Sequence, residues 1–205
     1  MIRMDVGDAE NVALALGGDQ DAFRVLVERH SRTLFRLAHR MTGNEQDAEE
    51  VVQETMMRAY RRLDRFESRS NFGTWLYRIA VNCSLDLMRK RRPEKNQRQL
   101  AKGDETEMQD PLDTAVSNDP GPDRLALSGE LGKQVKVAMM ALSPVERTAF
   151  VMRHFEGNSI EEIGETLGLG AGATKNSVFR AVQKLRQHLA PLVGHGHARS
   201  ASGEI

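Results

Sequence analysis

Hydrophobic residues recur at intervals of three and four along most of the chain, the spacing that gathers them on one face of an α-helix. Over residues 21–43 this pattern predicts one amphipathic helix or a pair of helices. Asn44 is a suitable N-cap for a further helix over residues 45–66, whose acids gather in its first turns and whose arginines gather in its last, as the helix dipole favours. A polar loop at residues 67–71 precedes another helix, which Pro93 ends because proline cannot continue a helix interior.

The segment 93–124 departs from this pattern and holds four of the six prolines, many acids and few large apolar side chains. Such a composition buries too little surface to offset the entropy lost on ordering, so we expect a flexible acidic linker. Helical spacing resumes over residues 125–192, and the tail at residues 193–205 is expected to be disordered. The sequence therefore predicts an all-α protein with two small helical domains, residues 18–92 and 125–192, after an N-terminal extension at residues 1–17.

Composition narrows the class of protein. The single cysteine, Cys83, excludes an internal disulfide and fits a reducing cytoplasm. No apolar run approaches the roughly 20 residues that a membrane-spanning helix needs, and the mixed charges of the N-terminus are unlike a signal peptide. The net charge is zero, but two basic blocks flank an acidic middle. We therefore expect a soluble cytoplasmic protein without membrane insertion, able to bind nucleic acid specifically but not indiscriminately.

The C-terminal domain carries the most specific local pattern. Ser143 and Ser159 are followed three residues later by Glu146 and Glu162, which is the spacing of a capping box at the start of a helix. A glycine-rich turn then leads into a longer basic helix that begins near residue 172. A short helix, a tight turn and a basic helix form the helix-turn-helix pattern, whose second helix enters the major groove of DNA. A solvated basic face is the alternative, and the capped short helix and the turn favour DNA binding.

Two blocks of the chain resemble regions 2 and 4 of the extracytoplasmic-function (ECF) group of bacterial RNA polymerase sigma factors, in the sigma-70 family. The first is "DAFRVLVERHSRTLFRLAHRMTGNEQDAEEVVQETMMRAYRRLDRF" with "FGTWLYRIAVN", and the second is "ALSPVERTAFVMRHFEGNSIEEIGETLG" with "ATKNSVFRAVQKLR". The resemblance implies a specificity subunit that binds core RNA polymerase and directs promoter-specific initiation in a stress or envelope response. Region 4 would read the −35 element as duplex, and region 2 would capture the melted −10 strand.

In region 2 the resemblance implies two sites. The polymerase-binding residues are Asp47, Glu49, Glu50, Gln53 and Glu54. For Glu49 a capped, solvated helix start is an equal alternative. A flipped base needs polar groups for its edge and a flat or apolar wall for its face. The implied −10 residues are Ser68, Arg69, Ser70, Asn71, Phe72, Trp75, Arg78, Asn82, Arg89 and Lys90. Trp75 either packs in the core or acts as a wedge at the melting junction, and the cations of "RKRR" hold phosphates.

In region 4 the resemblance implies −35 contacts from the basic helix. The candidate residues are Lys175, Asn176, Ser177, Phe179, Arg180 and Lys184. Ser177 stands where many members have arginine, which leaves the particular −35 sequence open. Phe179 lies at the margin of the apolar face, so packing and DNA contact are both open for it.

No catalytic, metal or cofactor site is expected. Cys83 lies in an apolar helix without a nearby histidine, and the chain has no phosphate-binding loop and no H-E-x-x-H motif. The expected partners are core RNA polymerase, promoter DNA and an anti-sigma factor. A stand-alone helix-turn-helix regulator that does not bind core polymerase is the alternative function, and it would need a dimerisation surface or ligand pocket that the N-terminal half does not offer.

Overall fold

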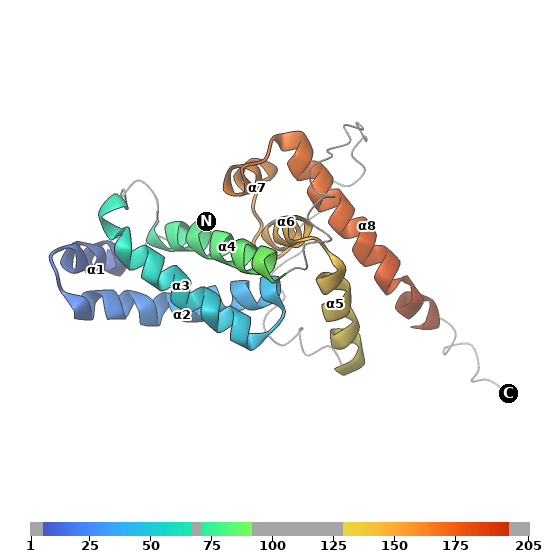
Figure 1. Ribbon diagram of the computed structural model, residues 1–205, viewed down its shortest axis with the longest axis horizontal. Coiled ribbons are helices and arrows are strands. Elements are labelled where there is room, and N and C mark those ends of the chain that lie inside the picture. Colours follow the sequence, from blue (N-terminus) through green and yellow to red (C-terminus); the bar gives the residue numbers. More distant parts are fainter. Residues whose placement is uncertain (1–5, 67–70, 92–128, 197–205) are drawn as a thin grey trace. The chain divides into compact units, whose positions relative to one another are not determined.

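The structure is a computed structural model that describes residues 6–66, 71–91 and 129–196, with side chains described from residue 7 and, in the last segment, over residues 132–190. In this part of the chain it contains eight α-helices, one 3-10 turn and no strand, which confirms the all-α prediction (Figure 1). The chain divides into two compact units, Met1–Arg91 and Arg92–Ile205. The predicted linker and the last nine residues lie outside the described residues.

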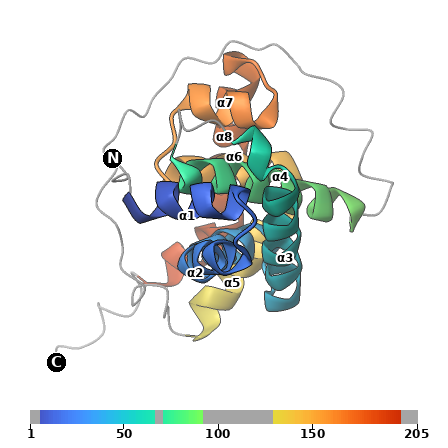
Figure 2. The same cartoon turned by 90° about the vertical axis from the view of Figure 1, so that its left-hand side faces the viewer.

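The first unit is built around α2. It contains α1 (Val6–Leu16), α2 (Gln20–Thr42), α3 (Glu45–Arg61), the 3-10 turn η1 (Leu63–Arg65) and α4 (Phe72–Lys90). Helix α2 packs against α1, α3 and α4, and Figure 2 shows it nearly end-on with α1 and α3 on different sides. The core between these helices includes Leu26, Leu37, Met41, Val51, Leu76 and Val81, all fully buried or nearly so.

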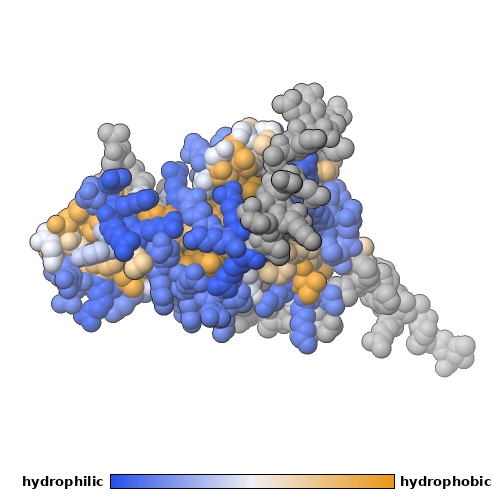
Figure 3. Space-filling view, in the orientation of Figure 1, coloured by the Kyte–Doolittle hydropathy of each residue, from blue (hydrophilic) through white to orange (hydrophobic). Residues whose placement is uncertain are grey.

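Local signals set the helix ends of the first unit. Gly43 adopts a left-handed φ of 82° and ends α2, and the side chain of Asn44 accepts from the Asp47 amide to cap α3. Both ends were predicted. Residues 21–42 form one continuous helix, which decides between the two alternatives left open by the sequence. Helix α1 occupies the predicted N-terminal extension and packs on α2, while its Leu14 and Leu16 stay exposed. Figure 3 shows apolar surface at the end of the first unit where α1 lies.

The second unit contains α5 (Gly129–Ala141), α6 (Pro144–His154), α7 (Ile160–Leu167) and α8 (Ala171–Gly196), and α8 packs against the other three. Both predicted capping boxes are confirmed, at the starts of α6 and α7. The turn before α8 is tight, because a Cβ added to Gly164 would lie 2.8 Å from the carbonyl oxygen of Leu169. This contact requires glycine and fixes the approach of α7 to α8.

The predicted end of the second domain needs a correction. Helix α8 continues to Gly196, so residues 193–196 of the tail are helical where disorder was expected. Disorder was expected there because the last residues of most domains are poorly ordered unless they are tied down. Gly194 does not end the helix. A single glycine inside a helix costs only about 1 kcal/mol relative to alanine and does not by itself end the helix. The exact outer boundaries of the two domains stay predictions.

Candidate nucleic-acid and polymerase interfaces

Helix α8 presents the predicted −35 side chains on a surface that stays largely open. Lys175 and Arg180 are exposed, Phe179 is 39% exposed, and Asn176 and Ser177 are half-buried. Ser177 Oγ donates to the carbonyl oxygen of Ala173 at 2.8 Å, within the same helix. Phe179 is therefore outside the core of the free chain, and the second helix of the helix-turn-helix exposes two cations and a half-buried amide.

The start of α8 is anchored from inside. Thr174 is fully buried, and its hydroxyl donates to the Gly170 carbonyl at 3.0 Å. The amide of Leu169 donates to the Gly164 carbonyl at 2.9 Å and closes the turn from α7. A rigid helix start matters here, because major-groove readout depends on the N-terminal residues of the recognition helix.

Lys184 has an internal partner that the sequence did not reveal. Its Nζ lies 2.8 Å from both carboxylate oxygens of Glu146 in α6, while the backbone amide of Ser143 donates to Oε2 of the same carboxylate at 2.8 Å. Burial by itself would raise the pKa of Glu146, but the hydrogen bonds from Lys184 and Ser143 outweigh it and hold that pKa below its ordinary value. Lys184 thus joins α8 to the capped start of α6, and its contact with DNA phosphates stays a prediction.

An aromatic cluster lies at the start of α4. Phe72 is 3% exposed, and its ring centroid lies 5.4 Å from Phe66, 5.6 Å from Trp75 and 5.7 Å from His30. These neighbouring rings cover Phe72 in the free chain, and its contact with a flipped base stays a prediction. The half-buried rings at this place are Phe66 and Trp75, 5.3 Å apart. Phe66 was missed, although it directly precedes the predicted base-binding loop.

The polar −10 candidates differ in their surroundings. Asn71 is the N-cap of α4, where its Oδ1 accepts from the Gly73 amide at 2.8 Å. Asn82 is exposed, and its side-chain amide donates to the carbonyl of Arg78 at 3.0 Å. Arg78, Arg89 and Lys90 are exposed. Ser68, Arg69 and Ser70 lie outside the described residues, so the loop they form is still known from the sequence alone.

Arg91, the next cation of "RKRR", turns towards α3. It pairs with Asp47 and donates to Glu50 Oε2 at 2.8 Å. Asp47 is buried, and its pair with Arg91 joins α3 to the end of α4. Its carboxylate is therefore not exposed in the free chain, and its contact with polymerase stays a prediction. Arg91 therefore has carboxylate partners on α3 in the free chain, and its contact with DNA phosphates stays a prediction.

The rest of the predicted polymerase surface lies along α3. Glu54 accepts from Arg58 Nε at 2.6 Å, and Arg58 also bonds Asp86 of α4 at 3.4 Å. Glu49 and Gln53 are exposed. Met57 (49% exposed) and Tyr60 (52% exposed) follow Glu49 and Gln53 at helical spacing along α3. The sequence did not identify either as a candidate contact residue.

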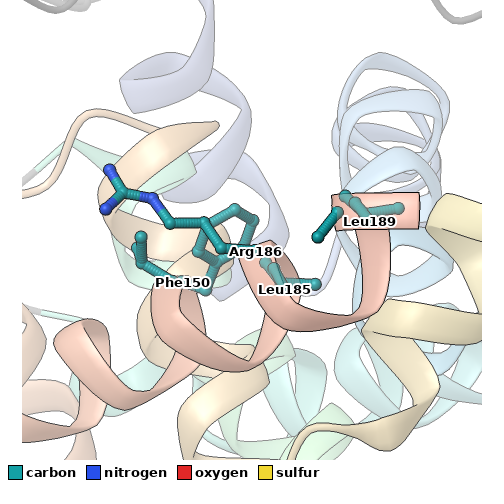
Figure 4. Close-up of a pocket in the computed structure, with 6 residues that line it drawn as sticks. Phe150, Leu185, Arg186 and Leu189 are labelled. Carbon is teal, nitrogen blue, oxygen red and sulfur yellow. The ribbon is translucent and has the colours of Figure 1, made fainter. Parts of the chain in front are cut away.

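An apolar groove lies on the second unit between α6 and α8. It has a volume of about 400 Å³ and is lined by Phe150, Val182, Leu185, Arg186, Leu189 and Ala190. Figure 4 shows Leu185 and Leu189 along α8 with the ring of Phe150 beside them and the guanidinium of Arg186 extending past that ring. Leu185 and Leu189 come from α8 and Phe150 from α6, and the sequence alone did not predict this groove.

Other chemistry is sparse in the described part of the chain. No group of three or more histidine, cysteine or acidic side chains there is placed to hold a metal ion. No helix among the described residues has both the length and the apolar character that crossing a membrane requires. Cys83 is buried in the first unit, and this burial raises the pKa of its thiol.

Comparison with known proteins identifies the family of the chain. The model for sigma-70 region 2 matches residues 26–94, and the model for sigma-70 region 4 matches residues 133–185. The ECF RNA polymerase sigma factor SigW of Bacillus subtilis is 34% identical over 175 residues, which cover 85% of this chain and 92% of SigW. The ECF RNA polymerase sigma-E factor of Escherichia coli K12 is 34% identical over 178 residues, covering 86% and 91%.

Solved structures agree with the sequence relatives. CnrH, in complex with the cytosolic domain of CnrY, is 28% identical with a TM-score of 0.56, covering 90% of this chain and 98% of CnrH. The sigma factor RpoE of Bartonella quintana, in complex with the anti-sigma factor NepR, is 26% identical with a TM-score of 0.55, covering 82% and 96%.

The described residues form helices in two compact units, with a helix-turn-helix in the second, an arrangement typical of DNA-binding transcription proteins. The chain belongs to the ECF group of the sigma-70 family of RNA polymerase sigma factors. The matches confirm the resemblance seen in the sequence. Sigma factors are transcription initiation factors and not enzymes.

Proposed function

We propose that the chain binds core RNA polymerase and directs it to promoters, with region 4 reading the −35 duplex and region 2 capturing the melted −10 strand. Residues 18–92 and 125–192 are the proposed extents of the two regions, in keeping with the matched segments at 26–94 and 133–185. The proposal rests on the match of two separate segments to regions 2 and 4. It is supported by the exposed cations of the recognition helix α8.

Duplex reading is supported by the chemistry of α8. Lys175 and Arg180 are exposed on the second helix of the helix-turn-helix, and Asn176 lies between them. Cations neutralise phosphates and set the salt dependence of binding, whereas arginine and asparagine also match base edges in the major groove. We therefore assign Lys175 to the phosphate backbone and Arg180 to a base.

Polymerase binding is supported by the surface of α3. Glu49, Gln53, Met57 and Tyr60 form an exposed stripe that is acidic at its start and apolar at its end. Exposed apolar side chains next to charged ones are typical of protein interfaces, where an apolar centre is enclosed by a polar rim. A stand-alone regulator is not favoured, because the region 2 match covers most of the first unit.

An anti-sigma factor is the proposed second protein partner. The structures of CnrH and of Bartonella RpoE are both complexes with a second protein, which for RpoE is the anti-sigma factor NepR. The groove at Phe150, Leu185 and Leu189 offers an apolar surface of the kind that an amphipathic helix covers. Action in the cytoplasm and a role in a stress or envelope response complete the proposal, and the ECF group to which the relatives belong supports both.

Transcription in vitro tests the proposal. Core RNA polymerase, with and without the chain, is supplied with fragments of the host genome, and transcripts are mapped to their start sites. We expect start sites that appear only with the chain and share a −35 and a −10 element. A chain that binds DNA but does not bind core polymerase would overturn the proposal in favour of the stand-alone regulator.

A further inference from the structure

Asp8 of α1 is a buried carboxylate held by two partners on α2. It is 5% exposed, Arg29 Nη1 donates to its Oδ1 at 2.6 Å, and His30 Nε2 lies 2.8 Å from its Oδ2. A carboxylate is costly to bury unless each oxygen has a hydrogen-bond partner, and here both have one. Asp8 precedes the segment matched by the family model, which begins at residue 26.

His30 continues this contact to the start of α4. Its ring meets Phe72 edge-on, with centroids 5.7 Å apart at 68°, and its Cε1 lies 3.3 Å from the place that a Cβ on Gly73 would occupy. Phe72 in turn packs against Trp75 and Phe66, the half-buried rings next to the predicted base-binding loop. A continuous path of contacts therefore runs from α1 to the proposed −10 surface.

The two partners of Asp8 differ in the helices that they connect. Arg29 joins α1 to α2 through its ion pair with Asp8. His30 joins the same carboxylate to the first residues of α4. A carboxylate on one ring nitrogen fixes both the orientation and the tautomer of an imidazole. The ring against Phe72 and Gly73 is therefore held in one orientation by a residue of α1.

We propose that α1 is part of the −10 reading site, with Asp8 as a positioning residue that holds His30 against Phe72 and Gly73. Supported by His30, the ring of Phe72 sets the position of Trp75 and of Asn71, the N-cap residue of α4. The inference rests on the proposed capture of the −10 strand by region 2, and it adds a residue that touches neither DNA nor polymerase.

The test uses the full chain bound to core polymerase and a fluorescent single strand from the −10 element of a promoter that it transcribes. Asp8→Ala removes the carboxylate, and His30→Gln keeps a donor for Asp8 but removes the ring that supports Phe72. We expect both variants to bind the strand about three- to tenfold more weakly, the range of one lost hydrogen bond or ring contact. The affinity for core RNA polymerase should be unchanged, because neither substitution alters the exposed surface of α3.

Two matched controls separate positioning from simple fastening. Glu10→Ala removes an exposed acid from the same helix, and Arg29→Gln removes the other partner of Asp8 while leaving His30 in place. Both should bind the strand almost as the wild type does. Trp75 is the only tryptophan of this chain, so in the free full-length chain, without polymerase, its emission reports the aromatic cluster directly. Its emission should shift in Asp8→Ala and His30→Gln and stay constant in the two controls.

The outcomes are distinct. If Asp8→Ala and His30→Gln bind the −10 strand as tightly as the wild type, this inference is overturned but the proposed function is not. Equal losses in Asp8→Ala and Arg29→Gln, with His30→Gln unaffected, would also overturn it, because α1 would then act only as a fastener. A wild-type complex that does not prefer the −10 strand over a scrambled strand would overturn the proposed function and this inference with it.

Discussion

The two units of the chain differ in how they treat the side chains that the sequence assigned to binding. In the second unit Lys175, Phe179 and Arg180 project from α8 into open surface. In the first unit Phe72 is buried among rings and Asp47 is paired with Arg91. A recognition helix packs along one face and leaves its other face open, whereas the helices around α2 use several faces for packing and for ion pairs.

This difference has a functional meaning. Duplex DNA presents base edges in its major groove, so a projecting helix can read it without rearrangement. A single strand must be held by rings and polar groups that surround each base, and such groups need support from behind. The first unit supplies that support in the cluster of Phe66, Phe72 and Trp75. We therefore expect changes in the second unit to act on stability or on DNA separately, and changes in the first to act on both.

The largest expected effect is on the stability of the second unit. Glu146→Ala removes a capping-box side chain and the carboxylate that pairs with the half-exposed Lys184, which together should lower the free energy of unfolding by about 2 kcal/mol. Glu162→Ala removes the same position of the second capping box, where Glu162 is exposed, and should cost about 1 kcal/mol. Circular dichroism follows both units, and Trp75 fluorescence follows the first alone. Equal losses in the two variants would contradict the role given to Lys184.

The same carboxylate makes the stability of the second unit depend on pH. The pKa of Glu146 is lower in the folded chain than its ordinary value of 4.5, so its contribution is complete above that value and is lost as pH falls further. Urea unfolding at pH 7 and pH 3.5 should show a larger loss in the wild type than in Glu146→Gln. An identical pH response in the two proteins would show that the ion pair with Lys184 contributes nothing.

A smaller effect separates two kinds of DNA contact on α8. Arg180→Ala should weaken binding of the holoenzyme to its preferred −35 duplex by about 1–3 kcal/mol and relax the preference at one base pair. Lys175→Ala should weaken binding to every −35 sequence alike and lower the salt slope by about 1. Competition with altered −35 duplexes over a range of salt measures both. Uniform losses from both variants would remove Arg180 as a base reader.

The smallest expected effect lies in the first unit. Arg91→Gln breaks the link from α4 to Asp47 and Glu50, and because Arg91 is half exposed the loss should be about 1 kcal/mol. Lys90→Gln changes the charge of the neighbouring exposed residue and is the matched control. Urea unfolding followed by Trp75 fluorescence measures both. A stability of Arg91→Gln equal to that of Lys90→Gln would show that Arg91 is free to hold phosphates.

Signals that lie close together in the sequence were the ones that predicted the structure. Gly43 and Asn44 mark a helix boundary by their own backbone and side chain, and Ser143 with Glu146 forms a motif within four residues. Contacts between distant residues escaped prediction. Lys184 and Glu146 are 38 residues apart, and Asp8 and His30 are 22 apart. Helical periodicity places a residue on a face, but it does not say which helix lies opposite, so the burial of Phe72 could not be foreseen.

The division of labour between the two units is tested most directly by permanganate reactivity of unpaired thymines at a promoter that the holoenzyme uses. With wild-type chain and core polymerase we expect reactive thymines within the −10 element. Arg180→Ala should relax the preference at one base pair of the −35 element while the thymines of bound promoters stay reactive, because the first unit holds the strand. Loss of reactivity on every bound promoter with Arg180→Ala, or reactivity that does not depend on the chain, would contradict the account.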